Sequence, residues 1–263
     1  MQPGSKAALI TGASGGIGYE LSKLFAADGY NLVLVARSQD KLDQAAAELS
    51  QGYGVNVLPL AVDLGDPAAP AEIHAALQAQ SIRIDVLVNN AGFGVHGPFA
   101  QTEWAEELAM LQVNAVTLTH LSKLLLPGML ERGWGRILNV GSTGSFAPAP
   151  LMAVYGASKA YVLSFSEALG EELRGTGVSV TALCPGVTRT GFQARAGVGS
   201  TRYVQSGTMT ARQVAEIGYR ALMRGQPVVV PGMANSALVL LSRFMPRALA
   251  TRIAYRMMER VES

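Results

Sequence analysis

The feature that most constrains the fold is a regular alternation of short apolar runs with longer segments of helical periodicity. Uninterrupted apolar runs are typical of strands buried on both faces, and their alternation with helices is typical of βαβ units on a parallel sheet. Seven strands are predicted, at Ala7–Thr11, Asn31–Ala36, Val55–Val62, Asp85–Asn89, Arg136–Val140, Val178–Cys184 and Pro227–Val230. The helices are predicted at Ile17–Asp28, Gln39–Ser50, Pro67–Gln80, Thr102–Arg132, Val154–Arg174 and Thr210–Arg224.

This alternation predicts an α/β protein with a doubly wound, parallel, seven-stranded sheet and helices on both faces. The 263 residues contain no internal repeat and no low-complexity linker. We therefore expect one domain over residues 1–231, extended by a helical tail of the same domain over residues 232–263. Only the glycine-rich loop Pro185–Met209 and this tail depart from the alternation.

The composition narrows the classes of function. The formal net charge of +2 is too small to indicate nucleic-acid binding. Cys184 is the single cysteine, which excludes an internal disulfide and fits a reducing compartment; we expect it to be a packing residue. We expect a cytoplasmic protein, because there is no basic-then-apolar leader and no run of ~18 apolar residues. The histidines lack metal-ligand spacing, so no metal site is expected.

A glycine-rich turn follows the first predicted strand and leads directly into a helix. The segment Thr11–Gly18 reads Thr-Gly-Ala-Ser-Gly-Gly-Ile-Gly, with its glycines spaced as GxxxGxG. The pyrophosphate of a dinucleotide needs a turn whose backbone amides approach it closely, at the positive end of a helix dipole. Glycine permits this approach because it has no Cβ. The turn therefore predicts a Rossmann-type dinucleotide site that uses Gly12, Ser14, Gly16, Ile17 and Gly18.

The end of the second predicted strand distinguishes between the two nicotinamide cofactors. An acidic residue there would bind the ribose hydroxyls of NAD(H) and repel a 2′-phosphate. This chain has Ala36 and then Arg37, whose guanidinium offers a charge-assisted fork to a phosphate. We therefore expect NADP(H) rather than NAD(H); the alternative is that Arg37 is only a solvated loop residue. Asp63, at the end of the third strand, is expected to meet the adenine.

A set of polar residues indicates acid–base chemistry at the same edge of the sheet. Ser142 follows the fifth strand, and Tyr155 and Lys159 lie four residues apart, hence on one face of the next helix. The ordinary tyrosine pKa of ~10 is too high for efficient acid–base work at neutral pH, and a nearby ammonium would lower it. We expect Tyr155 to be the proton donor, Ser142 to bind the substrate oxygen and Asn114 to hold a water that feeds protons inward.

The order of these motifs resembles the short-chain dehydrogenase/reductase family over about residues 5–230. Thr11–Gly18 resembles the family's TGxxxGIG loop, and Asn89–Gly92 resembles its NNAG turn. Asn114, Ser142, Tyr155 and Lys159 resemble its catalytic tetrad. The resemblance implies an oxidoreductase that interconverts a carbonyl and an alcohol with NADP(H). It also implies cofactor contacts from Asn90, Ala91, Gly92, Tyr155, Lys159, Pro185, Gly186, Thr188 and Thr190.

The substrate is expected to be small and apolar. The loop from Ser142 to Ala153 is apolar and has no charged residue to anchor a carboxylate or phosphate. A ketone, an aldehyde or a 3-oxoacyl compound fits this expectation. The use of NADP(H) favours reduction over oxidation. His96, in the loop after Asn89–Gly92, is a further candidate for contact with the substrate. A non-catalytic NADP(H)-binding sensor or scaffold would carry a damaged tetrad, whereas all four residues are present. An epimerase or dehydratase would need a larger C-terminal domain than the roughly 30 residues after the last strand.

Two further segments carry expectations of their own. Val187–Met209 contains four glycines and few large apolar residues, so we expect a lid that orders on ligand binding. In the tail, Pro246 is expected to separate two short helices. The second has an apolar stripe, Leu249, Ile253, Met257 and Val261, edged by Arg252, Arg256 and Arg260. We expect this stripe to pack on the body or on a second subunit of a homo-oligomer; the alternative is that the tail walls the pocket and contacts an anionic membrane.

Overall fold

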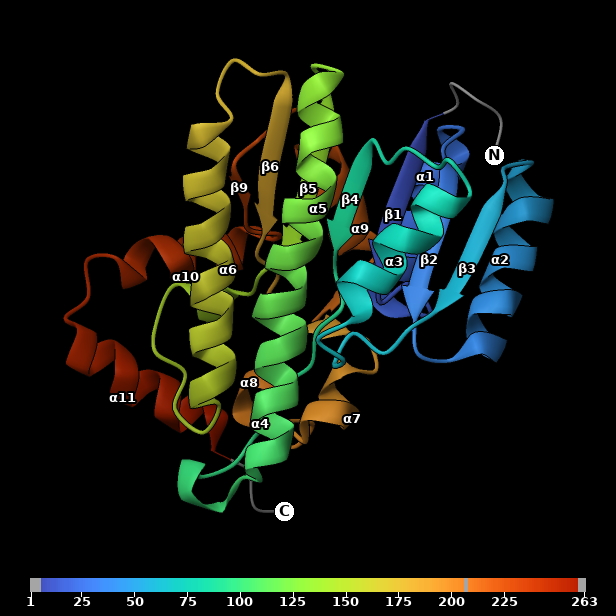
Figure 1. Ribbon diagram of the computed structural model, residues 1–263. Coiled ribbons are helices and arrows are strands. Elements are labelled where there is room, and N and C mark those ends of the chain that lie inside the picture. The colour runs from blue at the N-terminus through green and yellow to red at the C-terminus, as the bar shows by residue number, and fades with distance from the viewer. Residues whose placement is uncertain (1–5, 206–207, 260–263) are drawn as a thin grey trace.

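The computed structural model describes residues 6–205 and 208–259. Its centre is a seven-stranded parallel sheet with the strand order β3-β2-β1-β4-β5-β6-β9 (Figure 1). The strands are β1 (Ala7–Thr11), β2 (Asn31–Ala36), β3 (Val57–Ala61), β4 (Val86–Asn89), β5 (Gly135–Val140), β6 (Val178–Leu183) and β9 (Val228–Val229). The predicted fold class and all seven strands are confirmed. Because the order reverses direction between β1 and β4, a crevice forms at the carboxyl ends of these strands, where such folds bind ligands.

Helices cover both faces of the sheet, as the uninterrupted apolar strands require. On one face, Ile10 and Leu34 pack with α1 (Gly16–Ala27), α2 (Gln39–Tyr53) and α9 (Ala211–Met223). On the other, Leu9 and Val33 pack with α3 (Ala69–Ala79), α5 (Leu118–Glu131) and α6 (Ala153–Glu172), of which α5 and α6 lie in front in Figure 1. Alternate residues of one strand therefore serve two separate cores.

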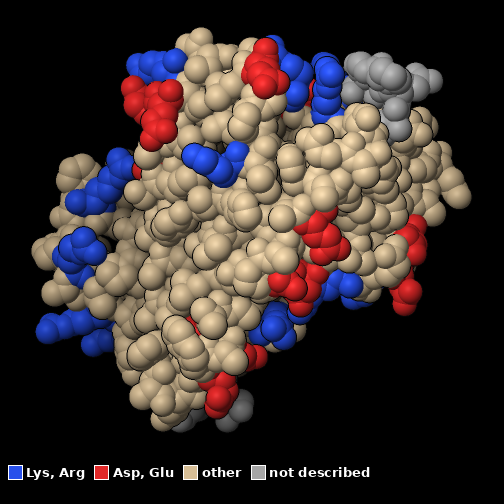
Figure 2. All heavy atoms as spheres, viewed as in Figure 1, with Lys and Arg blue, Asp and Glu red and all other residues tan. Residues whose placement is uncertain are grey.

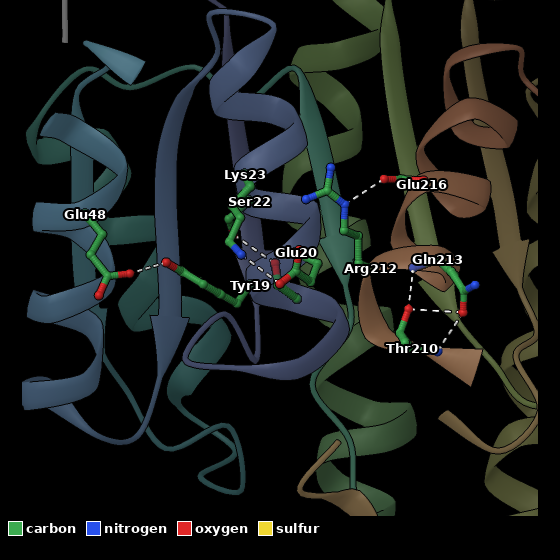
Figure 3. A network of polar contacts seen from close by, with 10 residues as sticks. Tyr19, Glu20, Ser22, Lys23, Glu48, Thr210, Arg212, Gln213 and Glu216 are labelled. Carbon is green, nitrogen blue, oxygen red and sulfur yellow. Dashed lines mark hydrogen bonds and ion pairs between the residues drawn. The ribbon is translucent and has the colours of Figure 1, made fainter. Parts of the chain in front are cut away.

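Helices α1 and α9 pack beside each other, and each has polar contacts of its own near the glycine turn (Figure 3). The hydroxyl of Tyr19 on α1 donates to the carboxylate of Glu48 on α2. Helix α9 begins with a capping box, in which the side chain of Thr210 accepts from the backbone N–H of Gln213 at 3.2 Å. The predicted start of this helix at Thr210 is thus explained by its cap.

The helix predicted over Thr102–Arg132 differs from the structure. A 3₁₀ turn at Phe99–Gln101 precedes α4 (Trp104–Leu111), and a π-helical segment, η2 (Gln112–Thr117), joins α4 to α5. A single wider turn shifts the register of the side chains without breaking the apolar periodicity, so the sequence pattern does not reveal it. Asn114 lies within this π-helical segment.

The predicted loop Pro185–Met209 is more structured than expected. It contains α7 (Phe192–Ala196), α8 (Arg202–Gln205) and a small two-stranded sheet of β7 (Thr188–Arg189) and β8 (Met209–Thr210). Phe192, Ala196 and Val198 give it apolar anchors. Its ordering on ligand binding stays a prediction, and residues 206–207 of the segment lie outside the described residues.

The tail forms α10 (Met233–Ser242) and α11 (Arg247–Met258), separated at Pro246 as predicted. The first two residues of the apolar stripe of α11 do not pack on the body, since Leu249 and Ile253 are 48% and 43% exposed. Packing of the stripe on a second subunit stays a prediction. The helix touches the body mainly at its C-terminal end, through Met258. Val261 of the predicted apolar stripe and Arg260 of its basic edge lie outside the described residues. No helix among the described residues is long and apolar enough to cross a membrane.

Candidate active site

The glycine turn Thr11–Gly18 is shaped by the side chain of Asn90. A Cβ on Gly12 would lie 2.8 Å from Nδ2 of Asn90, and a Cβ on Gly18 would lie 2.5 Å from the same atom. Gly12 also has a φ of +65°, a backbone conformation that favours glycine. These two glycines are therefore needed for the turn to close on Asn90.

The same turn leaves an open approach to the N-terminus of α1. Gly15 is the N-cap residue, and nothing lies within 4 Å of the position its Cβ would occupy. The first backbone N–H groups of a helix have no partner within that helix. Ile17 packs its side chain on the core, so only its backbone can face this opening. The turn and helix start thus fit an anionic group such as a pyrophosphate, as predicted for Gly12, Ser14, Gly16, Ile17 and Gly18.

Thr11 ties the turn after β1 to the turn after β4. Its hydroxyl accepts from the backbone N–H groups of Asn90 and Ala91, both at 3.0 Å, and donates to the carbonyl of Val88 at 3.2 Å. In return, Asn90 Nδ2 donates to the Thr11 carbonyl at 2.8 Å. The two predicted cofactor turns therefore form one rigid unit at the carboxyl edge of the sheet.

The outer edge of this crevice carries the residues predicted to select the cofactor. Arg37, directly after β2, is exposed and makes no hydrogen bond or ion pair with any residue the structure describes. Asp63 is also exposed, and its carboxylate accepts from the backbone N–H of Gly65 at 3.0 Å. An unpaired guanidinium at this place is free to bind a phosphate.

The segment after β6 closes over the glycine turn. A Cβ on Gly16 would lie 3.1 Å from Cγ2 of Thr190. Thr188 is buried and donates from its hydroxyl to the carbonyl of Gly186 at 3.1 Å. Pro185 accepts from the backbone N–H of Thr143 at 2.9 Å. The structure thus places Thr190 against the glycine turn, whereas cofactor contacts from Pro185, Gly186, Thr188 and Thr190 stay a prediction.

The side chains predicted to be catalytic meet beside the carboxyl ends of β4 and β5. Ser142 caps a short 3₁₀ turn, η3 (Thr143–Ser145), where its hydroxyl accepts from Gly144 N at 3.0 Å. The turn is tied to α6, because Ser145 Oγ donates to the carbonyl of Lys159 at 2.7 Å. The Ser142 hydroxyl also hydrogen-bonds to Tyr155, near the start of α6. Two hydroxyls from different elements therefore converge on one point.

Lys159 lies beside Tyr155 but its ammonium has another partner. The Nζ atom donates to the carbonyl of Val140 at 2.8 Å and lies 5.8 Å from the centre of the Tyr155 ring. Burial lowers the pKa of Lys159 to about 8. Burial also raises the pKa of Tyr155 above its ordinary value, which the hydrogen bond from Ser142 only partly offsets. The expectation that Lys159 lowers the pKa of Tyr155 is therefore wrong for the protein alone.

Asn114 is held firmly between two elements of the site. Its Oδ1 accepts from Phe93 N at 3.2 Å, and its Nδ2 donates to the Phe93 carbonyl at 3.0 Å and to Ser158 Oγ at 3.1 Å. A Cβ on Gly92 would lie 2.9 Å from Asn114 Oδ1 and 3.3 Å from Lys159 Nζ. Gly92 thus keeps open the space between these two polar atoms, and the π-helical turn places Asn114 there.

An apolar cluster lies against the ring of Tyr155. The rings of Tyr155 and Phe192 have centroids 5.5 Å apart. A Cβ on Gly94 would lie 2.7 Å from Met152 Cε, 3.1 Å from Phe192 Cζ and 3.3 Å from Tyr155 Cδ2. Met258 of α11 packs on the same cluster. The expected apolar surroundings of Tyr155 are present, and part of them comes from the tail.

A cleft of about 170 Å³ borders this cluster, between the loop after β4 and α7. Gly94, His96 and Arg195 are among its lining residues, and the Arg195 guanidinium lies 5.0 Å from the centre of the Phe93 ring. His96 Nε2 hydrogen-bonds to the carbonyl of Met258 at 2.9 Å. His96 therefore borders the cleft, as a contact with the substrate would require. It also holds the end of α11 through this hydrogen bond.

Reasoning from the sequence missed several residues of this site. Thr11 and Ser158 lie within the motifs that the sequence already showed. Their hydroxyl groups stand next to proposed functional residues, and this position could have indicated that they belong to the site. Phe192 and Met258 come from distant segments, and only tertiary packing brings them to Tyr155. Cys184 is buried, and burial raises its pKa to about 12, which confirms it as a packing residue.

Comparisons with known proteins agree with this geometry. A very-long-chain 3-oxoacyl-CoA reductase of Phaeosphaeria nodorum is 40% identical over 177 residues, which are 66% of this chain and 52% of that protein. The ketoacyl reductase HetN of Nostoc is 35% identical over 222 residues, 82% of this chain and 75% of that protein. This chain therefore spans about half the length of the first relative and three quarters of the second.

A solved structure gives the same picture in three dimensions. A short-chain dehydrogenase from Sphingobium yanoikuyae in complex with NADPH superposes with a TM-score of 0.80 and is 34% identical, over 92% of this chain and 97% of that one. The short chain dehydrogenase family matches residues 6–199, from β1 through α6 to the segment after β6. This protein is a member of the short-chain dehydrogenase family.

Proposed function

We propose that this protein is an NADP(H)-dependent reductase that converts an apolar ketone, aldehyde or 3-oxoacyl compound into the corresponding alcohol. The observation that carries the proposal is the convergence of the Tyr155 and Ser142 hydroxyls, beside an apolar cluster and at the crevice of the sheet. Two hydroxyl groups at one point suit a carbonyl oxygen, which accepts two hydrogen bonds.

The residues around the crevice fit the cofactor. The open N-terminus of α1 suits its pyrophosphate, and the unpaired Arg37 suits the 2′-phosphate that distinguishes NADP(H) from NAD(H). We assign the remaining cofactor contacts to Asp63, to the turn of Asn90, Ala91 and Gly92, and to the pair Thr188 and Thr190. The relative from Sphingobium yanoikuyae was solved with NADPH, which supports this choice.

The proton chemistry follows from burial and hydrogen bonding. The bound cofactor supplies a hydride to the carbonyl carbon. Tyr155 keeps its proton at neutral pH, because burial raises its pKa, and donates that proton to the substrate oxygen. Ser142 donates a hydrogen bond to the same oxygen. Lys159, with a pKa of about 8, and Asn114 flank the space at Gly92 where a water would return a proton to Tyr155.

The apolar cluster and the relatives indicate the class of substrate. Met152, Phe192 and Met258 surround Tyr155 with apolar surface, which suits a hydrocarbon chain rather than a charged group. The relatives in Phaeosphaeria nodorum and Nostoc are named as reductases of 3-oxoacyl-CoA and ketoacyl compounds. A 3-oxoacyl thioester is therefore the first substrate to test.

We also propose that the enzyme is a cytoplasmic homo-oligomer. Around α4, Phe99, Trp104 and Leu108 are 65%, 64% and 51% exposed. Exposed aromatic and aliphatic side chains that lie close together are typical of subunit interfaces. The single, reduced cysteine supports a reducing compartment.

The experiment that tests this function is a panel of carbonyl compounds incubated with purified protein and NADPH, followed by cofactor absorbance. The panel contains 3-oxoacyl thioesters of increasing chain length, apolar ketones, aldehydes and charged 2-oxo acids. We expect NADPH oxidation with apolar members and the alcohol as product. Tight NADPH binding without turnover of any compound would favour the non-catalytic sensor instead.

A further inference from the structure

The two tail helices expose an apolar face. Helix α10 contacts the body through Asn235, Val239 and Ser242, which share one side of the helix. The other sides carry large apolar residues that are from 57% to 91% exposed: Met233, Leu238, Leu240 and Leu241, continued by Phe244 after the helix. Isolated exposed apolar residues are ordinary, but a group of this size marks an interaction site.

The two tail helices are also strongly basic. Arg243, Arg247, Arg252 and Arg256 are exposed, and none of them forms an ion pair within the described part of the chain. Residues 233–258 contain no Asp or Glu. Figure 2 shows blue side chains along the left edge of the molecule, where Figure 1 places α11.

On α11, charge and apolar surface alternate along a single face. Arg252 and Ile253 lie three and four residues after Leu249, and four and three residues before Arg256, so these side chains share one side of the helix. All four are exposed. This arrangement mixes guanidinium groups directly with aliphatic side chains. Such a mixed face suits the boundary of a bilayer, where aliphatic side chains reach the acyl chains and the longer guanidinium groups extend to the phosphates.

The tail is held in place on the body. His96 Nε2 donates to the Met258 carbonyl, the backbone N–H of Arg202 donates to the Glu259 carbonyl at 3.5 Å, and Met258 packs against the cluster around Tyr155. The basic apolar face is therefore presented in a fixed orientation rather than on a loose segment. A preformed surface loses little conformational entropy when it binds.

We propose that α10 and α11 form a docking surface for an anionic lipid bilayer. The leucines, Phe244 and Ile253 enter the boundary between headgroups and acyl chains, and the four arginines contact lipid phosphates. A second copy of this chain is a poorer occupant. A two-fold contact would bring the same face together from both copies, so arginines would meet arginines with no acidic residue in the segment to neutralise them.

The test is sedimentation of the full-length protein with vesicles. One set of vesicles is phosphatidylcholine alone, and the other contains equal parts of phosphatidylcholine and phosphatidylglycerol. We expect the protein to pellet with the anionic vesicles only, and less as salt is added, because salt screens surface charges. The double variant Arg252→Glu and Arg256→Glu should bind more than about 30-fold more weakly, since two basic side chains leave the anionic surface.

A matched control separates this surface from general basic charge. Arg220→Glu with Arg224→Glu makes the same charge change at two exposed arginines, also four residues apart, at the end of α9. This control should pellet like the wild type. Leu240→Gln with Leu241→Gln should also weaken binding to anionic vesicles, because these leucines supply apolar insertion.

Three outcomes would overturn the proposal. The first is an absence of pelleting with anionic vesicles at low salt. The second is an equal loss of binding in the α9 control, which would show that net charge alone is responsible. The third is a smaller oligomer for the Arg252→Glu, Arg256→Glu variant in light scattering without lipid, which would make the face a subunit interface.

Discussion

The side-chain amide of Asn114 donates to the hydroxyl of Ser158 at 3.1 Å, and that hydroxyl donates to the carbonyl of Tyr155 at 2.7 Å. The π-helical turn and α6 are thus joined by one buried hydroxyl. Ser158 touches neither substrate nor cofactor in the proposed mechanism, so it is a positioning residue for Asn114 and Tyr155.

We predict that Ser158→Ala lowers kcat about tenfold and leaves KM nearly unchanged. A change of about tenfold corresponds to the net free energy of about one hydrogen bond. The expected reason is a loss of alignment at Tyr155 rather than of substrate binding. Steady-state kinetics measure the two constants. Ser164→Ala on the same helix is the control, because Ser164 is exposed. Equal changes in both variants, or a change in KM alone, would exclude the positioning role.

Lys159 gives a prediction about stability and pH. Burial lowers its pKa from 10.5 to about 8 in the folded state. Below pH 8, Lys159 is charged in both states, and burying its ammonium in the folded protein lowers the free energy of unfolding. Above pH 10.5, Lys159 is neutral in both states, so this cost disappears. Relative to Lys159→Met, the wild type should therefore gain up to about 3 kcal/mol of unfolding free energy as pH rises from 8 to 10.5. Urea unfolding of both proteins measures it, and a pH-independent difference would contradict the assignment.

Arg37 should determine the choice of cofactor. Changing Ala36→Asp together with Arg37→Ser places a carboxylate where the 2′-phosphate would bind and removes the guanidinium. The ratio of kcat/KM for NADPH over NADH should fall by about 10²-fold, in the range expected for a charged hydrogen bond. Lys41→Ser, at an exposed position on α2, should not change the ratio. A wild-type enzyme that already prefers NADH would refute the role of Arg37.

Much of the fold and of the site depends on residues that are neighbours in the sequence, and this part could be predicted. The strands are continuous apolar runs, and the glycine turn, the Tyr155 and Lys159 pair and the break at Pro246 each depend on neighbouring residues only. Because parallel strands end at one edge of a sheet, the strand assignment alone brought the motifs together.

The remainder depends on contacts between distant residues. The π-helical turn at Asn114 leaves the apolar periodicity almost unchanged, so the pattern predicted a plain helix. The raised pKa of Tyr155 follows from its burial, and the hydrogen bond of Lys159 to the Val140 carbonyl is a tertiary contact; no sequence spacing reveals either. The exposure of Leu249 and Ile253 likewise contradicts a helical pattern that is usually buried.

Gly94 should limit the size of the substrate. A methyl group there would press on the ends of Met152 and Phe192 and on the ring of Tyr155. Gly94→Ala should therefore raise KM about tenfold for long or bulky carbonyl compounds and less for small ones, as expected from losing about one to two methylene contacts. Gly199→Ala, where nothing lies near the added Cβ, is the control. Uniform effects on all substrates would argue against a role in specificity.

The most direct test of the account is the turnover of Tyr155→Phe in the presence of NADPH and the best substrate of the carbonyl panel. The ring still packs against Phe192, but no hydroxyl remains to donate the proton. We predict a loss of at least ~10²-fold in kcat, the range of general acid catalysis, with NADPH affinity unchanged within about twofold. Tyr161→Phe, which alters an exposed tyrosine six residues along the same helix, should keep full activity. Retention of more than about a tenth of the wild-type rate by Tyr155→Phe would contradict the central role of this residue.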